Sequence, residues 1–216
     1  MLQLYGHPFS SYTWKALIAF YANEIPFEFR MVDPDHPENS QKVADHSPLG
    51  KFPLLEDGDR WVFEATSIID YLALHFPGAS GLLPSDPDAA VTTRMIDRVF
   101  DNYVMTPMTD IVAEHMRSPG MPDPATEGRA RAVLDRSYVW LDRWLEGYSA
   151  GDSVTLIECA AAPSLFYADW AFPIPSSCER LRQWRAHLLS LAPVARCVDD
   201  ARPYRAWFPP GAPDRD

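Results

Sequence analysis

One stretch of this sequence constrains the fold more than any other: residues 46–72, HSPLGKFPLLEDGDRWVFEATSIIDYL. Two short apolar runs, PLLE and RWVF, flank Asp57-Gly58, and such a dipeptide between strand-like runs is a strong local signal of a β-hairpin. A helical pattern, ATSIIDYLALHF over residues 65–76, follows directly. The stretch therefore predicts a hairpin that passes straight into a helix, with Pro53 at the start of its first strand.

The residues before this stretch predict the rest of an α/β domain. LQLYG over residues 2–6 and FEFRMV over residues 27–32 indicate strands. SSYTWKALIAFYANE over residues 10–24 has the apolar period of a helix, and a weaker helical pattern covers residues 39–46. The predicted order of elements is β-α-β-α-β-β-α.

The character of the chain changes after this domain. Residues 79–88 are rich in Pro, Gly and Ser and predict a linker. Beyond them apolar residues recur with a helical period, first over residues 89–117, where Pro107 should kink the helix, and then to about residue 200. We therefore expect an α/β domain over residues 1–78 followed by an all-α domain over residues 89–216.

Charge, hydropathy and cysteine usage argue against several classes of function. The net charge of −11 disfavours nucleic-acid binding, because phosphates must be neutralised by Lys and Arg. No apolar run reaches the ~20 residues that cross a bilayer. Because the N-terminus also lacks the pattern of a signal peptide, we expect a cytoplasmic protein without a membrane partner. The three cysteines and six histidines lack the spacing of a disulfide framework or a metal site, so we expect no metal.

The dipeptide Phe52-Pro53 opens the first strand of the hairpin. Proline is tolerated at the first residue of a strand, so an ordinary edge residue is one interpretation. The other is a cis bond, since cis peptide bonds are almost confined to X-Pro sequences. The N–H and C=O of Phe52 would then point outward, where a peptide-like ligand could pair with them as an added strand. The sequence leaves both interpretations open.

The tripeptide Glu64-Ala65-Thr66 begins the helix after the hairpin. Free N–H groups and the positive end of the helix dipole suit a carboxylate there, and Thr66 adds a hydroxyl. Glu64 adds a negative charge that could pair with an ammonium group. Together these features describe a site for an α-amino-acid head. The alternative is capping alone, with Glu64 interacting with the helix dipole.

Ser10 and Ser11 stand at the start of the first predicted helix, after YGHPF. Either serine can cap that helix. A hydroxyl there can also donate a hydrogen bond to a thiolate, whose formation the helix dipole favours. The serine would then stabilise the sulfur of a ligand. No GxSxG motif and no triad order indicate a serine nucleophile.

These motifs, in this order and ahead of a helical domain, resemble the glutathione transferase superfamily over essentially the whole chain. LYGHPFSSYTWKALIA is similar to the serine-type classes, its GHPFS being phi-like and its SSYTWK zeta-like. PLGKFPLLEDGD with FEATSIIDYL is similar to the glutathione-binding stretch, and residues 151–170 to the buried capping-box helix. The resemblance implies a thioredoxin-like N-terminal domain (βαβαββα), an all-α C-terminal bundle, glutathione as co-substrate and a homodimer.

The resemblance also implies roles for individual residues. The backbone of Phe52 would pair with the cysteinyl part of glutathione, the helix start at Glu64 would hold the γ-glutamyl head, and Lys51 could reach a carboxylate. The implied glutathione-binding residues are Lys51, Phe52, Pro53, Glu64, Ala65 and Thr66. Ser10 would donate to the thiolate, with Ser11 the close alternative.

Other positions carry weaker expectations. Tyr5 in the first strand is a further candidate for the thiolate partner, as in tyrosine-type relatives, and Lys15 is expected on the surface of the first helix. Most aromatic residues of the helical domain are expected in the core. Those preferred as the lining of an apolar second pocket beside the sulfur are Tyr103, Phe166 and Trp170.

Two positions depart from the family pattern. Position 65 is Ala where the family usually has a Ser whose hydroxyl binds the γ-glutamyl carboxylate. Loss of one charge-assisted hydrogen bond should lower glutathione affinity about 10- to 100-fold. The backbone N–H groups at 65 and 66 or the Thr66 hydroxyl could compensate. Thr155-x-x-Glu158 keeps a capping box in which the family usually has Asp in place of Glu158.

Three functions follow as hypotheses. The first is an enzyme that directs the thiolate of glutathione at a small electrophile, by conjugation, peroxide reduction or isomerisation of a maleyl-type double bond. The second is a non-catalytic interaction or ligand-binding protein with a degenerate glutathione site, which Ala65 favours. The third, a serine hydrolase, is disfavoured by the missing elbow motif.

Overall fold

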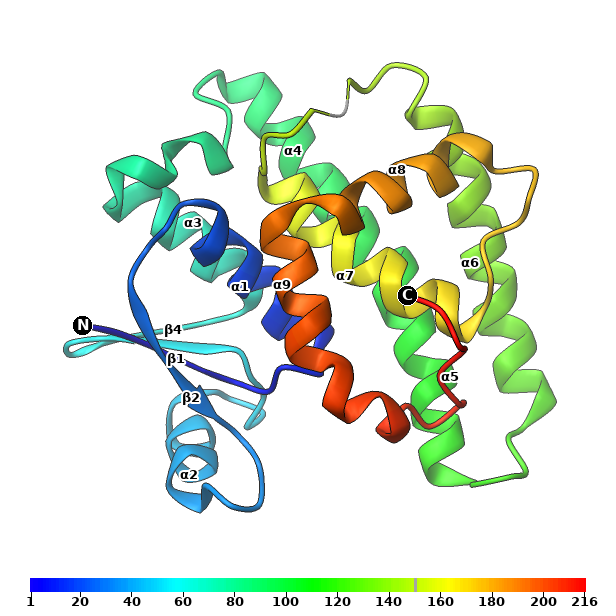
Figure 1. Ribbon diagram of the computed structural model, residues 1–216, viewed down its shortest axis with the longest axis horizontal. Helices are drawn as coiled ribbons and strands as arrows, with labels where there is room; N and C mark the ends of the chain where they lie inside the picture. Colours follow the sequence, from blue (N-terminus) through cyan, green and yellow to red (C-terminus); the bar gives the residue numbers. More distant parts are fainter. Residues whose placement is uncertain (150) are drawn as a thin grey trace.

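The computed structural model describes residues 1–149 and 151–216, and its N-terminal part is built on a four-stranded mixed sheet of order β2-β1-β3-β4 (Figure 1). β1 is parallel to β2 and antiparallel to β3, and β3 and β4 form an antiparallel hairpin. The strands are β1 (Leu2–Gly6), β2 (Phe27–Met31), β3 (Leu54–Asp57) and β4 (Arg60–Phe63). The helices are α1 (Ser11–Ala22), α2 (Pro37–His46) and α3 (Ala65–His75).

The predicted hairpin is present, with its turn one residue later than the Asp57-Gly58 signal. Asp57 is paired with Arg60 across the hairpin, so Gly58 and Asp59 form the two-residue loop. Gly58 has φ +59°, a backbone conformation that glycine adopts without steric cost. The turn brings β4 back beside β3, and α3 begins two residues after β4 ends.

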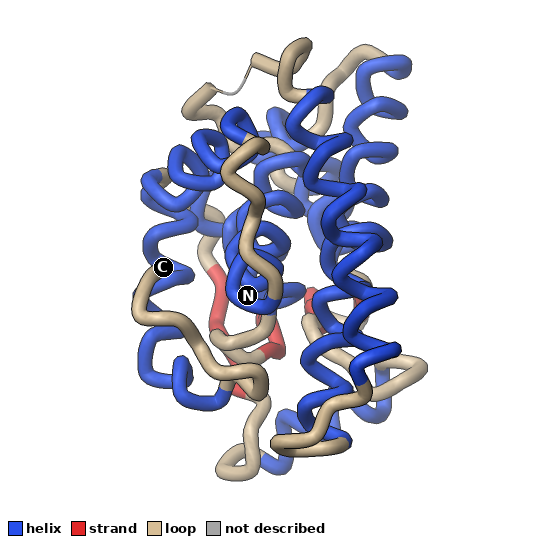
Figure 2. The backbone as a smooth tube through the Cα atoms, turned by 90° about the vertical axis from the view of Figure 1, so that its right-hand side faces the viewer, coloured by secondary structure: helices blue, strands red, loops and turns tan. Residues whose placement is uncertain are grey.

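The C-terminal part is helical, and Figure 2, which views the molecule from this side, shows helices lying in front of the strands. Its elements are α4 (Pro87–Val99), η2 (Phe100–Met105), α5 (Thr106–Arg117), α6 (Pro124–Trp144), α7 (Leu156–Ala171), α8 (Glu179–Ser190), α9 (Ala192–Ala201) and η3 (Arg202–Trp207). α7 is central to this part and is buried from Leu156 to Trp170. α1 packs against both α7 and α9, so the two parts of the molecule meet along it.

The long helix expected over residues 89–117 is interrupted by the π-helical turn η2, which ends just before Pro107. Proline has no N–H with which to continue the helical hydrogen bonds. The carbonyl of Tyr103, four residues earlier, instead accepts a hydrogen bond of 2.9 Å from the Ser137 hydroxyl on α6. The interruption thus places residues 100–105 against a second helix.

The segment expected as a linker contains secondary structure of its own. A 3-10 helix, η1, spans Pro77–Leu82, and the side chains of Ala79 and Leu82 are fully buried. These residues belong to one continuous hydrophobic core that includes residues of both the sheet and the helical part. The connection is therefore packed against the domains that it joins.

The capping box at Thr155 is present at the start of α7. The Thr155 N–H donates to the Glu158 carboxylate at 2.9 Å, and the Ile157 N–H donates to the Thr155 hydroxyl at 3.1 Å. The Tyr148 hydroxyl also donates to Glu158. The longer side chain of Glu158 therefore serves in the capping box without loss of its partners.

Three observations on the described residues bear on the functional site. Among the described residues no helix is long and apolar enough to cross a membrane. The cysteines Cys159, Cys178 and Cys197 are free and buried. Within the same described residues, no group of three or more His, Cys, Asp and Glu side chains is placed to hold a metal ion.

Candidate functional site

Ser10 and Ser11 stand at the N-terminal end of α1. Ser10 is the N-cap, with φ −94° and ψ 123°, and its hydroxyl accepts a hydrogen bond of 3.3 Å from the Thr13 N–H. Ser11 is the first residue of the helix. Both serines line a cavity of about 460 Å³ that we call the apolar cavity. The Ser10 hydroxyl proton is not used by the cap, so it can be donated to a ligand.

The peptide bond between Phe52 and Pro53 is cis, the second of the two interpretations that the sequence left open. Both residues line a neighbouring cavity of about 230 Å³, which we call the polar cavity. Lys51, Glu64 and Ala65 line the same cavity, so the structure brings together five of the six residues expected to bind glutathione.

Glu64 has an unusual backbone conformation at the start of α3. Its φ of +69° and ψ of 119° are rare for a residue with a side chain, and such conformations are concentrated at ligand sites. Its side chain is exposed and makes no capping hydrogen bond, which argues against the interpretation as a simple cap. Glu64 therefore lines the polar cavity at the start of α3 without capping the helix.

Thr66 is the expected site residue that the structure does not place in this lining. Its hydroxyl donates to the Asp97 carboxylate at 3.0 Å and accepts a hydrogen bond from the Arg98 guanidinium. One hydroxyl has a single proton to donate, so it has none left for a ligand. The idea that the Thr66 hydroxyl replaces the missing serine is therefore wrong.

Several residues of the polar cavity were not predicted from the sequence. Its lining is completed by Tyr12, Ser47, Arg98, Asp101 and Asn102. The last three come from the end of α4 and from η2, so the helical part supplies charged groups to a site that the motifs placed in the α/β part alone. The one available signal was the charged run at Asp97, Arg98 and Asp101 within an otherwise apolar helical pattern.

Lys15 was expected on the helix surface, and this was wrong. Its side chain is only 2% exposed, and its ammonium group lies 2.5 Å from Asp97 and 2.7 Å from Asp101. Burial raises the pKa of the Asp101 carboxyl, and Lys15 opposes that shift. Because α1 faces the helical part, the position that an isolated domain would expose is buried against two carboxylates.

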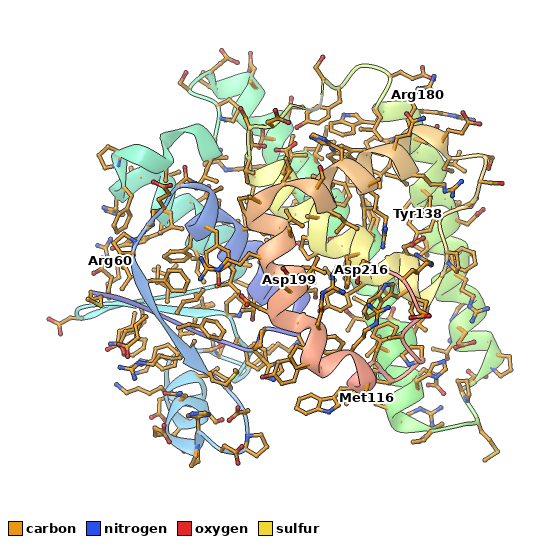
Figure 3. All side chains as sticks on the ribbon, in the orientation of Figure 1. Arg60, Met116, Tyr138, Arg180, Asp199 and Asp216 are labelled. Atoms are coloured by element: carbon orange, nitrogen blue, oxygen red, sulfur yellow. The ribbon has the colours of Figure 1, made fainter. Side chains whose placement is uncertain are left out.

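The apolar cavity has a lining that the motifs did not indicate. Its larger side chains are Phe9, Tyr12, Met108, Val112, Met116, Tyr167, Trp207 and Phe208. They come from α1 and its preceding loop, from α5, from α7 and from the C-terminal segment. Figure 3 labels Met116, which lies on the last turn of α5. Tyr12 and Lys51 line both cavities, so the two spaces are adjacent.

The three aromatic residues preferred for the second pocket do not line this cavity. Phe166 and Trp170 are buried in the core, where each packs against Tyr167. Tyr103 lines a different cavity, between the end of α4 and α6. Helical periodicity predicted which face of each helix is apolar, but it does not report what that face packs against.

Tyr5, the alternative thiolate partner, has its hydroxyl committed elsewhere. The hydroxyl donates to the Glu56 carboxylate at 2.6 Å, and the residue is 3% exposed. Burial, with a contribution from Glu56, raises the pKa of Tyr5 to about 12. The Tyr5 hydroxyl lines neither the polar nor the apolar cavity.

This arrangement, a four-stranded α/β part with a polar cavity at its edge and a helical part that closes it, matches known proteins. A family model of the glutathione S-transferase N-terminal domain matches residues 4–80. Glutathione S-transferase F6 of Arabidopsis thaliana is 30% identical over 177 residues, 77% of this chain and 83% of the relative. The chain therefore belongs to the glutathione S-transferase family, with a thioredoxin-like N-terminal domain and a helical C-terminal domain.

A solved structure and a second relative extend the comparison. The glutathione S-transferase of Methylobacillus flagellatus with glutathione bound has a TM-score of 0.78 and 25% identity, and covers 91% of this chain and 98% of its own. A stringent starvation protein A homologue of Coxiella burnetii is 29% identical over 177 residues, 80% of this chain and 77% of that protein. Similarity at this level thus includes proteins that are not named as transferases.

Proposed function

We propose that this protein is a glutathione transferase that binds glutathione in the polar cavity and a small hydrophobic electrophile in the apolar cavity. The observation that carries the proposal is the adjacency of the two cavities at the start of α1, where Ser10 stands. Family membership and a structural relative with glutathione bound support it. Holding both reactants side by side lowers the entropic part of the barrier.

In this proposal the polar cavity recognises glutathione through backbone groups and charges. The outward backbone of Phe52 pairs with the cysteinyl part as a short added strand. The start of α3 at Ala65 attracts the γ-glutamyl carboxylate, and Glu64 pairs with the ammonium group. Lys51 lies on the boundary of the two cavities, where it can reach the other carboxylate of the tripeptide.

Ser10 acts on the sulfur. Its hydroxyl donates a hydrogen bond to the thiolate, and the N-terminal end of α1 adds a favourable dipole, so the thiol of bound glutathione loses its proton at lower pH. The thiolate then attacks the electrophile, and its electron pair forms the new C–S bond while the leaving group departs or the double bond takes up the charge. Ser11, one residue further on, is the alternative donor.

The test is the thiolate absorbance of bound glutathione, titrated against pH in the wild type and in Ser10→Ala and Ser11→Ala. We expect a lowered thiol pKa in the wild type that rises in Ser10→Ala only. An unchanged titration in Ser10→Ala with a shift in Ser11→Ala would move the role to Ser11. If the thiol pKa of bound glutathione is not lowered in the wild type, the protein does not activate the thiolate.

Activity assays can decide which of three reactions the protein catalyses. Conjugation to an alkyl or aryl electrophile, peroxide reduction and isomerisation of a maleyl-type double bond all begin with the same thiolate. The lining of the apolar cavity, with Phe9, Met108 and Phe208, supports an apolar substrate. Assays with one substrate of each kind, at saturating glutathione, distinguish the three.

The second candidate is a non-catalytic interaction or ligand-binding protein with a degenerate glutathione site. Ala65 favours it, because the helix start lacks the hydroxyl that the family usually has there. The cis Phe52-Pro53 bond and the strained Glu64 favour the enzyme, since both retain the geometry of a ligand site. Glutathione binding in the millimolar range or tighter supports the enzyme, and its absence supports the alternative.

We further propose that the protein is a cytoplasmic homodimer. Exposed apolar side chains occur on α4, η2 and α6, and two of them, Tyr103 and Trp140, line a cavity of about 360 Å³. They are Val91, Met95, Tyr103, Val139 and Trp140. Exposed apolar side chains on neighbouring elements support an interaction surface. Light scattering should give twice the chain mass, and a monomeric mass would contradict the dimer.

A further inference from the structure

The start of α3 lacks a side-chain donor for a carboxylate. Ala65 is 4% exposed and ends in a methyl group, and the Thr66 hydroxyl is committed to Asp97 and Arg98. The N–H groups of the first helical turn remain, but the family's usual side-chain hydroxyl does not. A carboxylate at this helix end needs a further donor if it is to bind with ordinary strength.

Arg98 is placed to be that donor. It lines the polar cavity together with Ala65, and its guanidinium contacts the Thr66 hydroxyl, one residue along the first turn of α3. Its side chain is 50% exposed, so the group is reachable from the cavity. The helical part therefore brings a positive charge to the N-terminal end of a helix that belongs to the α/β part.

The hydrogen bonds of Arg98 leave one arm of the guanidinium free. Nε donates to Asp97 at 3.0 Å, and Nη2 donates to Asp97, to Asp101 at 2.8 Å and to Thr66. A guanidinium has five N–H donors, and Nη1 makes no hydrogen bond with any residue that the structure describes. Two donors thus remain on a group that its neighbours hold in place.

The charges of Arg98 and its neighbours balance one another, so the carboxylates carry no excess negative charge. Asp97 and Asp101 also face the buried ammonium group of Lys15, at 2.5 and 2.7 Å. The cluster therefore holds two positive and two negative groups, with the positive charge of Arg98 at its exposed edge. A ligand carboxylate would add a negative group at that edge.

We infer that Arg98 binds the α-carboxylate of the γ-glutamyl residue of glutathione through Nη1, in place of the serine hydroxyl that Ala65 lacks. This assignment rests on the proposed function. It makes a residue of the helical domain specificity-determining for the co-substrate, and it accounts for a cavity that keeps its other glutathione-binding features despite Ala65.

The test compares two ligands by calorimetric titration: glutathione, and 4-aminobutyryl-cysteinylglycine, which is glutathione without that α-carboxylate. Arg98→Gln should weaken glutathione binding about 10- to 100-fold and leave binding of the analogue unchanged. Arg94→Gln is the matched control, because Arg94 lies one turn earlier on α4, is 48% exposed, and pairs with Asp70 at 3.1 Å outside the cavity. It should bind both ligands as the wild type does.

Further variants separate recognition from folding. Arg98→Lys keeps the positive charge beside Asp97 and Asp101 but has no counterpart of Nη1. It should therefore also weaken the binding of glutathione and leave the binding of the analogue unchanged. Ala65→Ser in the Arg98→Gln background should recover part of the lost affinity. Equal binding of glutathione by wild type and Arg98→Gln, or equal losses for both ligands, would overturn the assignment. A wild type that binds neither ligand would overturn the proposed function itself.

Discussion

The two cavities that meet at the start of α1 are built in different ways. The polar cavity is lined by Phe52 and Pro53, by the start of α3 and by charged residues of both domains. The apolar cavity is lined mainly by side chains of α5 and of the C-terminal segment. The first holds fixed donors and charges, so single changes there should act sharply. The apolar cavity recognises a ligand by shape and apolar contact, so single substitutions there should change activity by small factors.

The largest effect is expected from the buried charge behind the polar cavity. Lys15→Met should lower the free energy of unfolding by about 3–5 kcal/mol, because it leaves two carboxylates without their buried partner. Urea denaturation measures this loss. The double variant Lys15→Met with Asp97→Asn should recover part of it, since the cluster then has one positive group, Arg98, for one remaining carboxylate. A loss below about 1 kcal/mol would show that the buried pair contributes no more than a surface pair.

Ser10→Ala should raise the pKa of the bound thiol by about one to two units, which corresponds to one charge-assisted hydrogen bond. Turnover at neutral pH should fall about tenfold or more as the thiolate fraction falls, while turnover at high pH should recover. Loss of the N-cap should also lower stability by about 1 kcal/mol. A turnover loss that is equal at all pH values would point to altered structure instead of an altered thiol.

Val112→Ala tests the graded behaviour of the apolar cavity. The smaller side chain should lower kcat/KM for an apolar electrophile several-fold, up to about tenfold, and leave the glutathione Kd unchanged. Leu74→Ala is the control, because Leu74 is 78% exposed on α3 and lines neither cavity. A change in glutathione affinity in Val112→Ala would contradict the separation of the two sites.

The smallest effect concerns His7, in the loop before Ser10. Its Nδ1 accepts a hydrogen bond of 3.1 Å from the Phe9 N–H, and burial lowers its pKa, with Asp33 opposing the shift. The unfolded chain therefore takes up this proton first, and stability falls as pH drops below about 6.5 towards the native pKa. His7→Asn keeps an acceptor and does not titrate, so its unfolding midpoint should fall less between neutral and acidic pH. If the unfolding midpoint falls equally with pH in the wild type and in His7→Asn, His7 is not the group responsible.

The local motifs predicted the α/β part well, because each depends on backbone geometry that a few residues specify. The hairpin around Gly58 and the start of α3 at Ala65 are of this kind. The local sequence could not distinguish a cis from a trans bond before Pro53, since a trans bond fits the same strand start.

The contributions of the helical domain could not be predicted in the same way. Lys15 and Arg98 lie far apart in sequence and are placed by the packing of α1 against the helical part. Periodicity also could not tell that Phe166 faces the core while Met108 faces the cavity, because both lie on apolar helix faces. Local sequence patterns do not predict the contacts between elements that are distant in sequence.

The most direct test of the account is calorimetric titration of glutathione into the wild type and the Ala65→Ser variant. The account predicts binding by both, tighter in Ala65→Ser by about tenfold, the lower end for a charge-assisted hydrogen bond because Arg98 already serves the carboxylate. Such a result would mean a working site in which one donor has been replaced. Absence of binding in both proteins would contradict the account, and the polar cavity would then be vestigial.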